Sequence, residues 1–244
     1  GCVTLVLVGY PLEPCTMWEV DKMVLCFDPA PMVDAGADDT TCEDTPYQLN
    51  GAEMNTCGLQ WVTFDGTGLF DDEEILNPVY TPTFADAITG TVHLVLLGAP
   101  CGACTVAAQD TMALTIQKRP ELYAGDADIM CEDASYTLAD ATAENFSALL
   151  WSSSGDGTWD DPALLNATYT PGPMDKALGV VELCLTGFSI APCLGFEQAC
   201  MTLNIQLNPS VDVLPTDSII CEGDSFDFTN LVTYGNYSAI QWFT

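Results

Sequence analysis

The chain has 244 residues, with 35 Asp or Glu against only 4 Lys or Arg, and a formal net charge of −31. Such a surface repels nucleic acid and anionic membranes, so we expect neither as a partner and no membrane insertion. Because 48% of the residues are hydrophobic and 16% are charged, the chain is expected to fold around a packed core. Its self-repulsion is best tolerated in a saline exterior that contains divalent cations.

An internal repeat is the clearest feature of the chain. LNPVYTP at 76–82 returns as LNATYTP at 165–171, 89 residues later. The same step relates GCVTLVLVG, GTVHLVLLG and GVVELCLTG, which begin at Gly1, Gly90 and Gly179. Solenoid repeats have periods of roughly 20–50 residues, so this longer period indicates a whole small domain that recurs along the chain.

The repeat predicts four segments. They are a partial repeat at 1–31, complete repeats at 32–120 and 121–209, and a second partial repeat at 210–244. Each of the last three segments carries a Cys-Glu pair and then a tryptophan, namely Cys42 and Trp61, Cys131 and Trp151, Cys221 and Trp242. The chain begins and ends inside a repeat, so we expect it to be a segment of a longer protein.

The local pattern is that of β-structure. Strands with one apolar face are expected at DKMVLCF, GTVHLVLLG and DTMALTI. In GTVHLVLLG, for example, Val92, Leu94 and Leu96 lie on the same side of the strand. Turn signals such as DGTG and SGDG separate short strands, and the tryptophan of each repeat occupies the place of strand C in an immunoglobulin-like sandwich. No segment has a convincing helical period. The predicted fold is all-β, with tandem immunoglobulin-like (PKD-like) β-sandwich repeats of about 89 residues.

The motifs of the complete repeats resemble a known family. TCEDTPYQL, LQWVTFDGTGLF, LNPVYTP and GTVHLVLLG are similar to the Ig-like and PKD-like tandem repeats of giant secreted surface proteins of Bacteroidota. The resemblance covers both complete repeats and both fragments. It implies an extracellular stalk, adhesin or filament, often exported by the type IX route, and it carries over no catalytic site. Asp44 and Asp133 replace a glycine of the family pattern, which Gly223 retains, so the geometry of that turn is in doubt.

Twelve cysteines accompany a single histidine, His93, which argues against zinc sites. The one CxxC, Cys101 to Cys104, has no second pair. Disulfides formed in an oxidising compartment are therefore expected.

Two of these disulfides follow from strand register. Residues that face each other across an antiparallel hairpin have positions with a constant sum. Cys2 and Cys26 have the same sum as Cys184 and Cys200 once two repeat lengths are subtracted. We predict both pairs as cross-strand disulfides.

The remaining cysteines lie in loops. Cys57 and Cys101 fall in the B–C and F–G loops at one end of a sandwich, so we predict that they pair. Cys42 recurs near the A–B turn and Cys193 recurs in an F–G loop, at the opposite end. Pairing within one repeat would span the long axis, far more than the roughly 4.4–6.8 Å between the Cα atoms of a disulfide. We predict Cys42–Cys193 between successive repeats, with Cys131 reaching a repeat outside this chain; the alternative is pairing within a repeat.

Acidic residues gather in equivalent loops of the two complete repeats. Asp71 and Asp72 in one correspond to Asp160 and Asp161 in the other. Calcium binds clustered carboxylates and loop carbonyls, so these four are candidate calcium ligands, although the EF-hand spacing is absent. The alternative is that the loops are simply solvated.

Short sequences of Asp, Ser or Thr and a third residue resemble the O-glycosylation sequon of the same phylum. They would place sugars on Thr40, Thr111 and Ser218. The alternative is that these hydroxyls are exposed strand positions without a modification.

No catalytic residues are expected. Paired carboxylates suit glycosidases, but they recur in each repeat, whereas an enzyme needs one shaped site. His93 stands where Thr4 and Glu182 stand in the other repeats and has no recurring nucleophile beside it.

The sequence therefore favours a non-enzymatic structural region of a large extracellular or cell-surface protein, a rigid disulfide-reinforced stalk or filament for attachment or adhesion. Its partners would be neighbouring repeats and copies of itself, with a surface ligand as a further option. Two alternatives remain: a glycan- or protein-binding Ig-like module, and spacer repeats of a secreted hydrolase.

Overall fold

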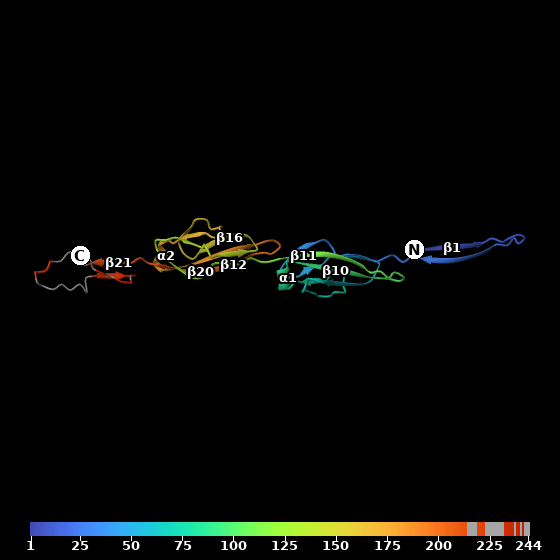
Figure 1. The fold of residues 1–244 in the computed structure, drawn as a ribbon, viewed down its shortest axis with the longest axis horizontal. Helices are drawn as coiled ribbons and strands as arrows, with labels where there is room; N and C mark the ends of the chain where they lie inside the picture. The colour runs from blue at the N-terminus through green and yellow to red at the C-terminus, as the bar shows by residue number, and fades with distance from the viewer. Residues whose placement is uncertain (214–218, 223–231, 237, 240, 242–244) are drawn as a thin grey trace. The chain divides into compact units, whose positions relative to one another are not determined.

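The chain is described from a computed structural model, which covers residues 1–213, 219–222, 232–236, 238–239 and 241. Trp242 and Ser218 lie outside these residues. The structure is all-β, and its two complete repeats are immunoglobulin-like β-sandwiches (Figure 1).

Contacts divide the chain into two compact units. Unit 1 contains residues 1–118 and 191–193, and unit 2 contains residues 119–190 and 194–244. Each unit holds most of one predicted complete repeat together with shorter sheets. The four predicted segment boundaries remain a prediction.

Unit 1 contains one short helix, α1 (Phe84–Thr89). Its strands, in chain order, are β1 (Cys2–Gly9), β2 (Glu19–Cys26), β3 (Met32–Asp34), β4 (Asp39–Cys42), β5 (Tyr47–Gln48), β6 (Ala52–Met54), β7 (Thr56–Thr63), β8 (Leu69–Phe70), β9 (Val79–Thr81), β10 (Thr91–Pro100) and β11 (Ala108–Gln117).

The sandwich of unit 1 has a four-stranded sheet in the order β4-β11-β10-β7 and a three-stranded sheet in the order β5-β9-β8. Strand β4 runs parallel to β11, whereas the other neighbours are antiparallel. Apolar side chains alternate along the strands, so one face of the larger sheet is buried. The fully buried side chains include Trp61, Tyr80 and Leu94.

The described residues of unit 2 contain one short helix as well, α2 (Pro173–Leu178). Its strands are β12 (Glu121–Tyr123), β13 (Asp128–Cys131), β14 (Tyr136–Thr137), β15 (Thr142–Glu144), β16 (Phe146–Ser153), β17 (Thr158–Trp159), β18 (Thr168–Thr170), β19 (Val180–Ser189), β20 (Phe196–Gln206), β21 (Ser210–Val213) and β22 (Val232–Gly235).

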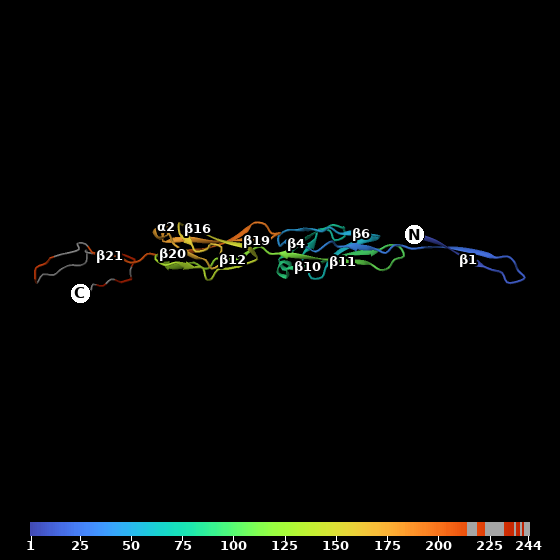
Figure 2. The ribbon, with the colours of Figure 1, turned by 90° about the horizontal axis from the view of Figure 1, so that it is seen from above.

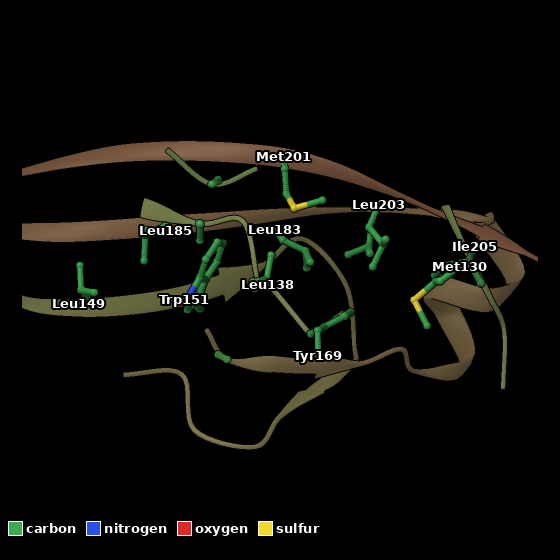
Figure 3. Close-up of a cluster of buried hydrophobic side chains, with 14 residues drawn as sticks. Met130, Leu138, Leu149, Trp151, Tyr169, Leu183, Leu185, Met201, Leu203 and Ile205 are labelled. Atoms are coloured by element: carbon green, nitrogen blue, oxygen red, sulfur yellow. The ribbon is translucent and has the colours of Figure 1, made fainter. Parts of the chain in front are cut away.

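The second sandwich repeats the first. Its sheets have the orders β13-β20-β19-β16 and β14-β18-β17. Figure 3 shows Trp151, Leu183 and Leu185 side by side in the core, with Tyr169 reaching the same layer from β18. Each tryptophan also donates its indole N–H to the carbonyl that opens the repeated LNxxYTP segment, Leu76 for Trp61 and Leu165 for Trp151, at 3.1 Å in both cases.

The helices are the feature that the sequence patterns did not predict. Each has six residues, fewer than two turns, so no helical period of apolar residues can develop. Local capping defines them instead. Helix α1 follows Thr83, whose hydroxyl accepts the N–H of Asp86, and ends at Gly90, where φ is 83°. Glycine adopts this left-handed conformation without the steric cost of a side chain.

Candidate functional site

Two disulfides cross β-hairpins, one in the two-stranded sheet of β1 and β2 and one in the four-stranded sheet of the second sandwich. Cys2 pairs with Cys26 and Cys184 pairs with Cys200, each with a Cα separation of 4.0 Å. Both pairs are register partners across their hairpins. These are the two pairs that the constant-sum argument predicts.

A third disulfide joins Cys57 to Cys101 with a Cα separation of 5.3 Å. Cys57 is the second residue of β7, rather than part of a loop before it, and Cys101 directly follows β10. The bond fastens the end of the β10–β11 hairpin to the neighbouring strand, in the pairing that the sequence predicts.

The fourth disulfide joins Cys42, at the end of β4, to Cys193, in the connection from β19 to β20. Both side chains are 3% exposed, and the sulfur of Cys193 lies 3.2 Å from the carbonyl oxygen of Gln117. Residues 191–193 belong by their contacts to unit 1. The structure therefore contains the predicted long-range pair and not its alternative, because Cys104 of the same repeat has a free thiol.

Cys104 occupies the same kind of place as Cys193. Its sulfur lies 3.5 Å from the carbonyl oxygen of Asp28, the residue 89 positions before Gln117. The N–H of Ala103 donates to the carboxylate of Asp28 at 2.8 Å, which fixes the loop there. The thiols of four cysteines are free: Cys15, Cys104, Cys131 and Cys221.

A buried carboxylate lies at one corner of the first sandwich. Asp86 of α1 is 1% exposed. One of its oxygens accepts the N–H of Thr67 at 2.7 Å and the Thr67 hydroxyl at 3.0 Å; the other accepts the Tyr80 hydroxyl at 3.0 Å and the N–H of Thr83 at 2.9 Å. Burial by itself raises the pKa of Asp86, but the hydrogen bonds from Thr83 and Thr67 outweigh it and hold the pKa below its usual value.

Tyr80 completes this corner. Its hydroxyl accepts the N–H of Gly68 at 3.1 Å, in the DGTG turn. A Cβ atom on Gly68 would lie 2.5 Å from the tyrosine ring, so only glycine fits this close approach. Burial and the bond to Asp86 raise the pKa of the Tyr80 hydroxyl. The network joins the turn, the helix and the repeated LNPVYTP segment.

The second sandwich has the same corner. Asp175 of α2 is 1% exposed and accepts the Tyr169 hydroxyl at 2.6 Å and the N–H of Gly172 at 3.0 Å. Gly157 donates its N–H to Tyr169 at 3.1 Å. Here the start of the helix is capped by Asp156, whose carboxylate accepts the N–H of Met174 at 3.1 Å. Neither buried aspartate was predicted from the sequence, although each lies six residues after the repeated tyrosine.

Two of the candidate calcium ligands, Asp71 and Asp160, accept hydrogen bonds from backbone N–H groups nearby in the sequence. Asp71 accepts the N–H groups of Asp72 and Val79 at 2.9 and 2.7 Å, and Asp160 accepts those of Asp161 and Thr168 at 2.7 Å each. These bonds lower the pKa of Asp160, with the one from Thr168 contributing most.

A metal-ligand arrangement is not apparent at these aspartates. Within the part of the chain that the structure describes, the one group of three potential metal ligands is Glu182 with Cys184 and Cys200. Its cysteines are disulfide-bonded, so they offer no thiolate. Calcium binding by Asp71, Asp72, Asp160 and Asp161 remains a prediction.

His93 is exposed on β10. Its Nδ1 is 2.6 Å from the carboxylate of Asp65, which also accepts the His93 N–H at 2.9 Å. Both side chains are about half exposed, at 56% and 43%. The backbone hydrogen bond from His93 is the largest contribution that lowers the pKa of Asp65.

The predicted glycosylation sites are partly visible. Thr40 on β4 and Thr111 on β11 are exposed, whereas Ser218 lies outside the described residues. Modification at these hydroxyls remains a prediction. No helix among the residues that the structure covers is long and apolar enough to cross a membrane.

The chain matches no protein-family model and no curated protein. Solved structures to which the chain is similar include tandem cadherin repeats. Protocadherin Gamma B2 extracellular cadherin domains 3–6 are 12% identical, with a TM-score of 0.43, and 74% of this chain covers 49% of that one. Mouse Cadherin-23 EC22–24 is 13% identical, with a TM-score of 0.45 and coverages of 73% and 67%.

A third example is Protocadherin Gamma B7 extracellular cadherin domains 1–4, at 13% identity and a TM-score of 0.44, where 91% of this chain covers 63% of that chain. The chain thus spans 49% of the length of the Gamma B2 structure and 63% of the length of the Gamma B7 structure. The likeness is distant, and the sandwich description rests on the sheets of this chain.

Proposed function

We propose that this chain is a non-enzymatic structural repeat region of a large extracellular protein, where it acts as a disulfide-reinforced stalk or filament for attachment. The observation that carries the proposal is the Cys42–Cys193 bond, which spans 151 residues of sequence with both sulfurs buried. A cross-link over such a distance limits how far the chain can be stretched, whether or not the sandwiches unfold.

The duplication of local features supports a structural role. The buried aspartate, its tyrosine partner and the glycine of the adjoining turn occur once in each sandwich, at equivalent positions. These three residues join the turn, the helix and the strand at one corner of the fold, and the same contacts occur in both sandwiches. Repeated chemistry of this kind stabilises architecture, whereas catalysis requires one differentiated site.

An exterior location is supported by four disulfides and by the high acidity, since disulfides persist in oxidising compartments. Within this proposal we include secretion by the type IX route, from the resemblance to Bacteroidota repeats. Calcium at Asp71, Asp72, Asp160 and Asp161 and sugars at Thr40 and Thr111 are further proposals. Calorimetric titration with calcium and intact-mass measurement of the secreted chain test them.

Single-molecule stretching tests the mechanical role. The oxidised chain, pulled by its ends, is compared with the C42S/C193S variant after both have unfolded. The Cys42–Cys193 bond keeps the residues between its two cysteines out of the stretched path. In the variant, Cys57–Cys101 and Cys184–Cys200 still bypass part of that segment, so about 90 residues join the path. At roughly 3.3–3.6 Å each, they should make the variant extend roughly 300 Å further.

The C57S/C101S variant is the matched control. Its missing bond lies inside the loop that Cys42–Cys193 closes, so its final extension should equal that of the unmodified chain. Equal extension of the C42S/C193S variant and the unmodified chain would contradict the mechanical role of the Cys42–Cys193 bond.

A further inference from the structure

Three side chains with metal-binding atoms meet on the exposed face of the larger sheet in the second sandwich. Glu182 and Cys184 lie two residues apart on β19, so both point to the same side of the sheet. Cys200 is the register partner of Cys184 across the β19–β20 hairpin. One carboxylate oxygen and the two sulfurs all lie within 4.8 Å of one another. The sulfurs form a disulfide here, so the carboxylate alone is available to a metal.

The Cys184–Cys200 bond is open to solvent. Cys200 is exposed and Cys184 is half-buried, whereas Cys42 and Cys193 are each 3% exposed. Thiol–disulfide exchange requires that an attacking thiolate reach one of the sulfurs. A soluble dithiol should therefore reduce Cys184–Cys200 well before it reaches Cys42–Cys193.

The hairpin does not depend on this bond for its position. Strands β19 and β20 pair over nine residue pairs inside the sheet β13-β20-β19-β16, whose last three strands are labelled in Figure 2. On the other face of the hairpin, Leu183, Leu185 and Met201 are buried in the core. The packed sheet therefore holds the carboxylate and the two cysteines together after the bond has opened.

Two thiolates and a carboxylate suit Zn²⁺. Zinc binds cysteine sulfur at about 2.3 Å and carboxylate oxygen at about 2.0–2.2 Å in a tetrahedron, so its donor atoms are roughly 3.6–3.8 Å apart. The two sulfurs, 2.08 Å apart in the disulfide, would reach this spacing by rotation about their Cα–Cβ bonds. Water would take the fourth position. The formal net charge of −31 also favours the approach of a dication.

The other hairpins lack this combination. At the two cysteine positions, the β10–β11 hairpin has Val95 and Thr111. The β1–β2 hairpin has the pair Cys2–Cys26, but the residue two positions along its strand is Thr4, which offers a hydroxyl and no carboxylate. Among the described residues, three such ligand atoms come together in the β19–β20 hairpin alone.

We propose that the dithiol form of this chain binds Zn²⁺ through Cys184, Cys200 and Glu182, and that formation of the Cys184–Cys200 disulfide expels the metal. The chain has this dithiol form before its disulfides close, and it regains the form on contact with a dithiol reductant. Zinc and the cross-link are then alternatives, so the metal delays the closing of the covalent bond. The inference does not rest on the proposed structural function.

The chemistry balances in two steps. A dithiol reductant gives two electrons and two protons to the disulfide, becomes a disulfide itself, and leaves Cys184 and Cys200 as thiols. Zn²⁺ then displaces one proton from each thiol, while the Glu182 carboxylate binds without losing a proton. In the reverse direction, oxidised glutathione takes two electrons from the two thiolates and takes up two protons. It becomes two molecules of the reduced thiol, and Zn²⁺ is released as the disulfide forms.

Differential alkylation of the full chain tests the site. Iodoacetamide first blocks the free thiols of the oxidised chain, and dithiothreitol then opens the exposed disulfides. After anaerobic removal of the reductant, a second, isotopically labelled alkylating reagent is added at a series of buffered zinc concentrations. Mass spectrometry of the peptides reports the labelling of each cysteine. Zinc should protect Cys184 and Cys200 at lower concentrations than Cys2 and Cys26, and equal protection of the two pairs would overturn the proposal.

Glu182→Gln separates a three-ligand site from a simple pair of thiols. Even the outer-shell partners of a bound metal cost about 10–100-fold in affinity when they are mutated. Loss of the carboxylate should therefore raise the zinc concentration that half-protects the two cysteines by roughly tenfold or more.

Glu144→Gln is the matched control for that substitution. It removes an exposed carboxylate from the same sandwich, on β15, which pairs with β12 and lies outside the sheet of the hairpin. It should leave the half-protecting concentration unchanged. An unchanged value with Glu182→Gln, or the same increase in both variants, would exclude Glu182 as a ligand and overturn the site.

Reoxidation provides a second measurement. Oxidised glutathione is added to the reduced chain with and without zinc, and samples are quenched with acid and mapped by peptide. The Cys184–Cys200 bond should form more slowly when zinc is present, and Glu182→Gln should remove most of this delay. Equal rates with and without zinc would contradict the view that the metal and the disulfide exclude each other.

Discussion

The two sandwiches build the same buried corner with different residues. In the first, Thr83 precedes the helix and caps it through its hydroxyl, and Thr67 donates to the buried Asp86. In the second, the residue before the helix is Gly172, and Asp156, at the position of Thr67, caps the helix from the adjoining turn. The capping side chain therefore comes from the residue directly before the helix in the first sandwich and from the adjoining turn in the second.

This exchange shows what the repeat preserves. The carboxylate on the helix and the tyrosine hydroxyl that it accepts are present in both corners, whereas the residues around them vary as a pair. A Cβ atom on Gly172 would lie 2.2 Å from the carboxylate of Asp156, so the two second-sandwich residues depend on each other. Both sandwiches keep the buried aspartate and its tyrosine, and each caps the adjoining helix with a different residue.

The hairpins differ in a related way. Cys184–Cys200 crosses the β19–β20 hairpin, but the equivalent register pair in β10–β11 is Val95 and Thr111. The first sandwich ties its hairpin to β7 through Cys57–Cys101 instead. Each sandwich thus has one local cross-link, placed differently.

The largest effect should come from removing a buried carboxylate. Asp86→Ala leaves the Tyr80 hydroxyl and the N–H groups of Thr67 and Thr83 without an acceptor in a buried site. We expect the unfolding free energy of the first sandwich to fall by about 3–5 kcal/mol. Hydrogen exchange measured by peptide should localise the loss to that sandwich.

Asp175→Ala should reproduce that loss in the second sandwich, and Glu74→Ala, at an exposed position, should stay within about 0.5 kcal/mol. A loss in both sandwiches from one substitution would contradict the view that each corner stabilises its own repeat.

The next effect comes from giving the first sandwich the cross-link of the second. V95C/T111C places two cysteines at the register positions of Cys184 and Cys200. The closed loop is short, so the new bond should stabilise the first sandwich by up to about 3 kcal/mol. Denaturant midpoints with and without reductant measure the gain. Failure of the bond to form under oxidising conditions would show that the equivalence of the two hairpins does not extend to this pair.

A smaller effect should follow from mixing the two corner solutions. Gly172→Thr introduces a side chain against Asp156, and we expect a loss of about 1–3 kcal/mol from overpacking. The double variant D156T/G172T re-creates the pair found in the first sandwich and should recover most of that loss. A double-mutant cycle from denaturant unfolding measures the coupling. Additive effects would mean that the two positions are independent.

Much of this architecture is readable from the sequence, because the repeat aligns equivalent residues without any structure. The β-sandwich, the buried Trp61 and Trp151 and the hairpin register all follow from period-two apolar patterns and the repeat step. The four disulfide pairs of the structure are those that register and loop position predict.

The buried corners are not readable in this way. An aspartate in an apolar core runs against composition, and only the arrangement of the turn, helix and tyrosine in space supplies its hydrogen-bond donors. The six-residue helices are hidden because they are too short for an apolar helical period, and the capping of α2 depends on Asp156, which lies far from the helix in sequence. The recurrence of Asp86 and Asp175 after the repeated tyrosine was the available signal.

The smallest effect concerns pH and again separates the corner from its surroundings. The folded pKa of Asp86 lies below its usual value, so the carboxylate contributes stability that is fully present above the unfolded pKa of about 3.9. This contribution is lost as the pH falls through the folded pKa. The unfolding free energy of the first sandwich should therefore decrease on acidification from about pH 6 to about pH 2.

Asp86→Asn isolates this contribution, because Asp39 and Asp65 also have lowered pKa values in the first sandwich and remain in the variant. The variant should be less stable at neutral pH and should show a shallower decline in acid, measured by denaturant unfolding at each pH. A decline as steep as that of the unmodified chain would assign the acid sensitivity to the exposed carboxylates, and the buried corner would then contribute through packing and neutral hydrogen bonds alone.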